Sequence, residues 1–304
     1  MNNDLAPVIL FVYNRPEHTR KTIDALKNNL LAWDTELFIF ADAAKNDAER
    51  NNVEKVRKYI KTLDGFKSIT LIEREENLGL AKSILSGVTE IINQYGKIIV
   101  LEDDLITSTP FLNYMNYYLN YYKNEQKVFS ITGFNYPESL LHVPDEYPYS
   151  IYFGYRCMSW SWATWINRWN KVDWEVKDYD KFITDKKSKK LFNRGGEDLS
   201  DMLRSQVEDK IDSWAIRWCY AQSKSDAYCV YPVKSLVNNM GFDGTGVHCG
   251  KTNRFAIKTL SENLDFRDPP VIVANEYLAK QVRGRYRHNC KIRIGKLFRR
   301  LLNG

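Results

Sequence analysis

The sequence contains few cysteines, and they form no recognisable pattern. None of the five belongs to a CxxC or CxxH pair, and all are widely spaced along the 304 residues. Paired spacings would indicate a zinc site, and a dense, even set would indicate the disulfide framework of a small secreted domain. We therefore expect free thiols in a reducing compartment. The cysteines are Cys157, Cys219, Cys229, Cys249 and Cys290.

The beginning of the sequence lacks the features of a targeting segment. The stretch MNNDLAPVILFVYNR has no basic region ahead of its apolar run, and Asn14 and Arg15 interrupt that run early. A signal peptide needs a basic region and a longer apolar run, and a membrane-spanning helix needs about 20 apolar residues. Glycine and proline are also scarce, at 15 and 9 residues, which argues against long disordered stretches. We predict a folded protein in the cytoplasm.

Acidic residues are absent from segment 277–304, which holds nine Lys or Arg. These nine positive charges exceed the net charge of +6, so the rest of the chain carries a net charge of −3. A nucleic-acid-binding protein would show its basic face over the folded part of the chain. We therefore expect no nucleic-acid partner.

The same basic segment has an apolar stripe. Apolar residues recur at i, i+3, i+4 and i+7 from Ile294 to Leu301, with basic residues largely on the other side. This pattern predicts an amphipathic helix that would attach residues 283–304 to an anionic membrane surface. The alternatives are a helix docked on the protein body and a disordered tail, and Gly295 weakens any helix here by about 1 kcal/mol.

Short β-rich apolar runs alternate with helical patterns over the first hundred residues. The predicted strands are 8–14, 36–43, 68–75 and 97–104, and the predicted helices are 16–30, 47–61 and 79–94. This alternation predicts an α/β fold with a mainly parallel sheet flanked by helices, in which ligands bind beyond the carboxyl ends of the strands. Each predicted strand ends in polar residues. Neither GxGxxG nor GxxxxGK[ST] is present, so a dinucleotide site and a P-loop lack their glycines.

Three consecutive carboxylates, Glu102, Asp103 and Asp104, end the fourth predicted strand. Like charges this close repel one another and resist removal from water, so a shared structural role without a cation is costly. Mg²⁺ or Mn²⁺ offsets that cost, since it typically binds one or two carboxylates together with water and phosphate oxygens. The pattern favours a metal–nucleotide site over the alternative, in which the carboxylates cap the next turn and face water.

In order and spacing, these motifs resemble those of GT-A glycosyltransferases, both family 2 and the N-acetylglucosaminyltransferase I type. The resemblance rests on VILFVYNRPEHTRKTIDAL, FADA, the NLG segment and the EDD motif. It implies that Asp104 binds the metal, with Asp103 and Glu102 near the ribose and the donor sugar, and that the nucleotide base lies between the end of the first strand and Asp42. The other residues assigned to the nucleotide sugar are Tyr13, Asn14, Arg15 and Asn77.

The resemblance divides the chain into three parts. Residues 1–105 form the nucleotide-sugar-binding half, 106–255 the acceptor-binding and catalytic half of the same domain, and 256–304 a carboxyl-terminal extension. By resemblance to inverting GT-A enzymes, Asp212 is the candidate general base, and Glu208 and Asp209 are its rivals. Asp212 precedes an aromatic helical pattern, so a simple helix N-cap is the alternative.

Two further segments of the second half are unusual in composition. MGFDGTGVHCG, residues 240–250, is a tight glycine-rich loop that the resemblance places over the donor diphosphate, with His248 as a second metal ligand, a phosphate contact or a structural residue. The stretch 156–169 is rich in tryptophan, whose ring can cover the apolar face of a sugar. Core packing is the default for these tryptophans, and one or two of Trp160, Trp162 and Trp165 are expected at the sugar site.

Three functions follow from these observations. The first is an inverting, metal-dependent glycosyltransferase that moves a sugar from a UDP-type donor to a glycan or lipid-linked acceptor, with Mn²⁺ or Mg²⁺ as cofactor. The second is a nucleotidyltransferase, although its usual glycine-rich, lysine-containing opening motif is missing. The third is a non-catalytic carbohydrate-binding protein on the same fold.

Overall fold

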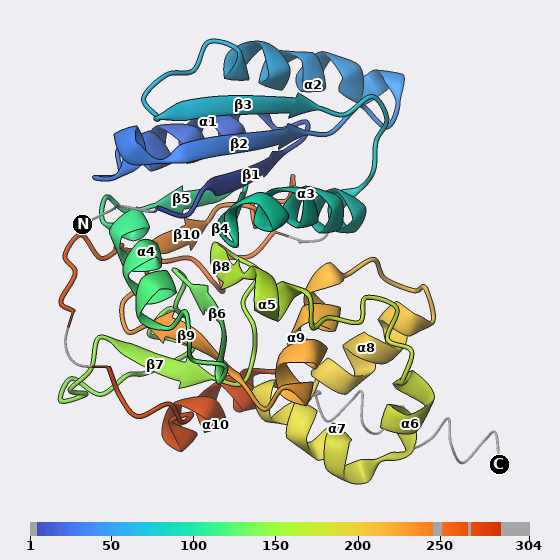
Figure 1. The fold of residues 1–304 in the computed structure, drawn as a ribbon, viewed down its shortest axis with the longest axis vertical. Coiled ribbons are helices and arrows are strands. Elements are labelled where there is room, and N and C mark those ends of the chain that lie inside the picture. The colour runs from blue at the N-terminus through green and yellow to red at the C-terminus, as the bar shows by residue number, and fades with distance from the viewer. Residues whose placement is uncertain (1–4, 246–250, 267–268, 287–304) are drawn as a thin grey trace.

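A mixed eight-stranded sheet forms the centre of the molecule, with strand order β3-β2-β1-β4-β8-β6-β9-β7 (Figure 1). The structure is a computed structural model that describes residues 5–245, 251–266 and 269–286. The strands are β1 (Val8–Val12), β2 (Glu36–Ala41), β3 (Ser68–Glu73), β4 (Lys97–Glu102), β6 (Val128–Thr132), β7 (Ile151–Gly154), β8 (Trp162–Trp165) and β9 (Tyr228–Pro232). A small antiparallel pair, β5 (Leu105–Thr107) with β10 (Val237–Asn239), lies beside it.

Most neighbours in the sheet run parallel. Strands β3, β2, β1 and β4 are parallel neighbours, and β6 pairs in parallel with β9. Within this sheet, β8 runs antiparallel to β4 and β6, and β7 runs antiparallel to β9. The α/β fold with a mainly parallel sheet is therefore confirmed.

Alternation of side chains along each strand builds one apolar core on each face of the sheet. In β1, Val8, Leu10 and Val12 belong to one core, and Ile9 and Phe11 belong to the other. A strand that is buried on both faces reads as a continuous apolar run, which is why VILFV carries no polar residue. The two cores hold the carboxyl ends of the strands in fixed positions.

Different helices cover the two faces. The first core takes side chains from α1 (Pro16–Lys27), α2 (Asp47–Ile60) and α4 (Phe111–Tyr121). The second takes them from α3 (Leu80–Tyr95), α5 (Ile166–Trp169), α6 (Tyr179–Thr184), α7 (Lys186–Phe192), α8 (Leu199–Val207) and α9 (Trp214–Lys224). A third cluster includes Leu278 of α10 (Glu276–Arg285), and Figure 1 shows this helix near β7.

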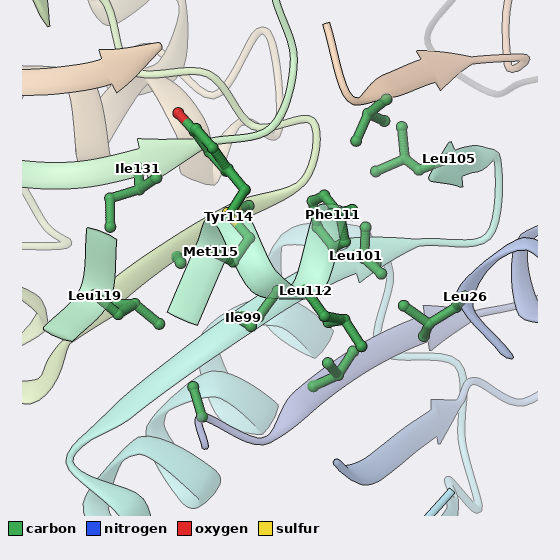
Figure 2. Close-up of a cluster of buried hydrophobic side chains, with 14 of the residues drawn as sticks. Leu26, Ile99, Leu101, Leu105, Phe111, Leu112, Tyr114, Met115, Leu119 and Ile131 are labelled. Carbon is green, nitrogen blue, oxygen red and sulfur yellow. The ribbon is translucent and has the colours of Figure 1, made fainter. Parts of the chain in front are cut away.

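Helix α4 secures the middle of the sheet. Its buried residues Leu112, Met115 and Leu119 share a core with Ile99 of β4 and Ile131 of β6 (Figure 2). Each fully buried side chain of this size contributes about 1.5 to 3 kcal/mol. This packing fixes the strand whose carboxyl end holds the acidic residues.

The sheet is continuous across the predicted boundary at position 105, because β4 pairs with β8 through Lys97–Trp165 and Val100–Trp162. The subdivision at positions 105 and 255 stays a prediction. No helix within the described ranges combines the length and apolarity needed to span a bilayer. The predicted amphipathic helix of the tail lies almost wholly in 287–304, outside the described residues.

Candidate active site

The polar residues that follow the parallel strands gather at one edge of the sheet. Residues 13–15 follow β1, Asp42 follows β2, Asn77 lies beyond β3, and 102–104 end β4. Since these four strands are parallel neighbours, their carboxyl ends lie side by side. The predicted donor-binding residues therefore share one edge.

Asp42 is a buried carboxylate that holds the NLG segment in place. Its Oδ1 accepts hydrogen bonds from the backbone N–H groups of Leu78, at 2.9 Å, and Ala43, at 3.0 Å. Its Oδ2 accepts one from Gly79 at 3.1 Å. Gly79 has φ of 72°, a left-handed conformation that glycine adopts without steric cost. Asp42 therefore shapes the loop that carries Asn77.

Asn77 and Tyr13 brace the loop after β2. The side-chain amide of Asn77 donates to the carbonyl oxygen of Ala43 at 2.8 Å. The hydroxyl of Tyr13 donates to the carboxylate of Glu49 and accepts from the backbone N–H of Lys45. Burial, followed by the hydrogen bond to Glu49, raises the pKa of Tyr13 to about 12, so this hydroxyl stays protonated at neutral pH. These contacts fix the positions of the loops on one side of the carboxyl edge of the sheet.

Arg15 reaches from the end of β1 to the acidic residues of β4. Its Nη2 donates to Oδ1 of Asp103 and to Oδ2 of Asp104, the latter at 2.9 Å. One nitrogen contacts both side chains, so an oxygen of each carboxylate points at the same position. Burial opposes the positive charge of Arg15, yet the two carboxylates raise its pKa above the ordinary value.

Burial and mutual repulsion make the charged forms of the acidic residues at the end of β4 unfavourable. Burial, then the charges of Asp104 and Asp103, raises the pKa of Glu102 to about 8. Burial also raises the pKa of Asp103 to about 6, against the opposing charge of Arg15. Oδ2 of Asp103 is buried and has no hydrogen-bond partner. A cation placed among these groups would lower the repulsion and satisfy the orphaned oxygen.

These residues fit a divalent cation. No group of three or more His, Cys, Asp or Glu side chains in the described part of the chain could hold a metal by itself. Mg²⁺ and Mn²⁺ do not require one, because one or two carboxylates suffice when phosphate and water supply the other oxygens. The converging oxygens of Asp103 and Asp104 meet that requirement.

The described part of the glycine-rich loop, residues 240–245, begins directly against Asp104. The backbone N–H of Met240 donates to the carbonyl oxygen of Asp104 at 2.8 Å. A Cβ on Gly241 would come within 2.1 Å of Oδ2 of Asp104, so only glycine allows this approach. Asp243 pairs with His18 of α1 at 3.1 Å. The predicted metal or phosphate ligand His248 lies outside the described residues.

The candidate base Asp212 is exposed and precedes α9. The side chain of Ser213, rather than that of Asp212, caps this helix by accepting from the N–H of Ile216, so the alternative role of Asp212 as N-cap is wrong. Trp214 lies 4.9 Å from Trp162, ring to ring, and Trp162 pairs with Val100 near the end of β4. This contact brings the start of α9 toward the edge that holds the acidic residues.

The rivals Glu208 and Asp209 are also exposed. Glu208 pairs with Lys210 at 2.5 Å. Asp209 has φ of 52°, the left-handed conformation of a tight turn. None of the three acidic residues has a described contact with residues 102–104.

The three tryptophans considered for the sugar site differ in exposure. Trp162 and Trp165 are core residues, with 1% and 5% exposure. Trp160 is partly exposed, and its ring meets Phe242 of the glycine-rich loop edge-on at 5.3 Å. Of these three, only Trp160 is partly exposed, and its ring also meets Phe134 and Phe255 edge-on.

Two supporting residues have no signal in the sequence. Thr22 of α1 donates its hydroxyl to the carbonyl oxygen of Asp103 at 2.8 Å. Arg57 of α2 donates to the carbonyl oxygens of Ala41, Asp42 and Arg74 and so ties the ends of β2 and β3 together. Both contacts join segments far apart in the sequence, and a family alignment would be needed to notice them.

The sheet and the acidic edge define a GT-A glycosyltransferase fold. The family model described as glycosyl transferase family 2 matches residues 8–183, which is more than half of the chain. The protein therefore belongs to glycosyl transferase family 2. No curated protein matches the sequence significantly.

Several solved structures are similar to this chain at low identity. A mannosyltransferase from Pyrobaculum calidifontis, solved with GDP-Man and Mn²⁺, is 15% identical over 54% of this chain and 48% of its own, with a TM-score of 0.37. Residues 1–349 of S. aureus TarS are 11% identical over 79% and 61%, with a TM-score of 0.44. The galactosyltransferase LgtC is 10% identical over 74% and 72%, with a TM-score of 0.36. The chain thus spans about half the length of the mannosyltransferase.

Proposed function

We propose that this protein transfers a sugar from a nucleotide diphosphate donor, of the UDP type, to a hydroxyl of a glycan or lipid-linked saccharide. The observation that carries the proposal is the convergence of the Asp103 and Asp104 oxygens on one cation position. This position lies at the carboxyl edge of a family 2 sheet, beside the braced loops that follow β1 and β2. Family membership favours this function over the nucleotidyltransferase alternative.

Separate groups of residues would bind the donor and act on the acceptor. Tyr13, Asn14 and Asp42 form the nucleotide wall, with Asn77 beside it. Asp104, with Asp103 beside it, would hold Mn²⁺ or Mg²⁺, which supplies positive charge to the diphosphate as it leaves. Glu102 and Asp103 would lie near the ribose and the donor sugar.

The reaction that we propose is a single inverting displacement. The acceptor oxygen bonds to the anomeric carbon while the bond from that carbon to the phosphate oxygen breaks, and the nucleoside diphosphate leaves. Asp212, which is exposed and precedes α9, takes the proton of the acceptor hydroxyl and so acts as the general base.

Incubation of the protein with UDP- and GDP-sugars, Mn²⁺ and a panel of saccharide acceptors tests the function. Free nucleoside diphosphate together with a lengthened acceptor supports it. Pyrophosphate release from a sugar phosphate and a nucleoside triphosphate would instead identify a nucleotidyltransferase. Saccharide binding without any nucleotide-dependent turnover would identify a carbohydrate-binding protein and overturn the proposal.

A further inference from the structure

The guanidinium of Arg15 stands where the carboxylates of Asp103 and Asp104 converge. Its Nη2 contacts both side chains, and all three residues are largely buried, with side-chain exposures of 18%, 5% and 14% for Arg15, Asp103 and Asp104. Since both acceptor oxygens aim at one nitrogen, Arg15 occupies the position at which a divalent cation would contact the same two oxygens.

The backbone of Arg15 is fixed, so only its side chain can leave this position. Arg15 is the residue before α1, its φ and ψ are −117° and 78°, and Pro16 follows it. Its carbonyl oxygen accepts from both the backbone N–H and the hydroxyl of Thr19, each at 3.0 Å. The long side chain has several rotatable bonds beyond this anchor, so a change of rotamer can move the guanidinium without moving the backbone.

Two cations cannot fill one position between the carboxylates. We propose that Arg15 is an internal counter-cation that competes with the divalent metal for Asp103 and Asp104 and leaves them when metal and nucleotide bind together. The released guanidinium remains anchored beside the site and can pair with the diphosphate, an anion whose geometry it matches. This inference rests on the proposed function.

Competition of this kind couples the two ligands. Metal alone must displace Arg15 without a new partner for the guanidinium, so it binds weakly. Metal with a nucleoside diphosphate supplies that partner, so each ligand strengthens the binding of the other by the same factor. Removal of the guanidinium should weaken this coupling to the part that comes from direct contact between the metal and the diphosphate, because the carboxylates are then open to the metal at all times.

Binding of Mn²⁺ to the full chain, measured by electron paramagnetic resonance with and without UDP, tests the inference. We expect Arg15→Gln to bind Mn²⁺ alone about tenfold more tightly than the wild type and to bind UDP more weakly. UDP should tighten Mn²⁺ binding to the wild type by a larger factor than it tightens Mn²⁺ binding to the variant. Arg50→Gln, which removes an exposed arginine of α2 paired with Asp47, is the matched control and should behave as the wild type.

Equal or weaker binding of Mn²⁺ alone to Arg15→Gln would overturn the inference. A thermal unfolding curve of the variant shows whether it is folded, and Arg15→Lys offers a second test, since a smaller cation on a flexible stem should give an intermediate Mn²⁺ affinity. The inference fails separately from the proposed function. If the wild type transfers sugar while Arg15→Gln binds Mn²⁺ no better, only the role of Arg15 is wrong.

Discussion

At the scale of single residues, carboxylates at the same edge differ in role because their partners differ. Asp42 accepts three backbone hydrogen bonds and so builds the loop that carries Asn77. Asp103 and Asp104 share a single guanidinium nitrogen, and Oδ2 of Asp103 has no partner. A satisfied carboxylate is a structural element, whereas a buried and partly unsatisfied one is available to a ligand.

We propose that the exposed carboxylate of Asp212 takes part in the chemical step. We expect Asp212→Asn to lower kcat by about 10²-fold or more, because a general base acts in the transition state. Donor affinity should change little, since a general base acts on the acceptor hydroxyl in the transition state and is not assigned to nucleotide binding. Steady-state kinetics with a saturating acceptor measure both quantities.

Glu208→Gln and Asp209→Asn are the controls for this prediction, since both residues are equally exposed and lie in the same segment. They should retain the wild-type kcat. If Asp212→Asn remains fully active while one of these two loses activity, the base has been assigned to the wrong carboxylate.

At the scale of elements, the first half of the chain could be predicted closely from the sequence. The predicted helix 47–61 is α2 at Asp47–Ile60, and the predicted strand 97–104 is β4 at Lys97–Glu102. Local signals suffice there, because strands buried on both faces are apolar throughout and each is followed by a helix with a clear apolar stripe. The gathering of polar residues at the carboxyl edge follows from that regularity, whereas the roles of these residues were predicted from the resemblance to GT-A glycosyltransferases.

The second half could not be predicted to this extent. Strand β8 is only WATW, and its role depends on pairing with β4, far away in the sequence.

The contact of Arg15 with Asp103 and Asp104 also joins distant segments, and a sequence pattern does not show where a long side chain points. All three candidates for the sugar site are tryptophans, so residue type could not distinguish them. The structure does, because Trp160 is partly exposed while Trp162 and Trp165 are buried.

A buried ion pair joins the elements of the second half. Arg156 donates two hydrogen bonds to Asp198, at 2.9 Å and 3.0 Å, and its guanidinium lies 4.0 Å from the ring of Tyr286. We expect Asp198→Asn to lower the free energy of unfolding by about 2 kcal/mol, since it removes charge-assisted hydrogen bonds from a buried arginine. Urea unfolding measures the loss.

Asp64→Asn provides the comparison, because Asp64 also pairs with a basic residue, Lys27, but at the surface. It should leave the urea midpoint unchanged within error. A loss in Asp198→Asn no larger than in Asp64→Asn would show that the Arg156 pair does not stabilise the fold.

At the scale of the whole molecule, the match to family 2 ends at residue 183, while the sheet continues through β9 at Tyr228–Pro232. The described chain then ends on α10 and Tyr286. Arg285 donates to the carbonyl oxygens of Leu140 and Ser139, which ties α10 to the body. Residues beyond 286 can therefore be removed without breaking these contacts.

We expect the full chain to sediment with anionic vesicles and a chain ending at Tyr286 to remain in solution. Each Lys or Arg near an anionic surface contributes about 1 kcal/mol, and segment 287–304 holds six of them. Neutral vesicles should bind neither chain. Equal binding of both chains to anionic vesicles, or binding of neither, would rule out attachment through the tail.

The central claim is that Asp104 makes donor binding depend on a divalent cation. Its most direct test is the thermal unfolding of the wild type and Asp104→Ala with nucleotide sugars, with and without Mn²⁺. A ligand at about 100 times its Kd stabilises the folded state by about 2.7 kcal/mol, which corresponds to a rise in Tm of about 5 °C. We expect that rise for the wild type with a UDP-sugar and Mn²⁺ together, and none for Asp104→Ala, whose Tm without ligand should stay close to that of the wild type. A UDP-sugar that raises the Tm of both proteins equally, with or without Mn²⁺, would contradict this claim.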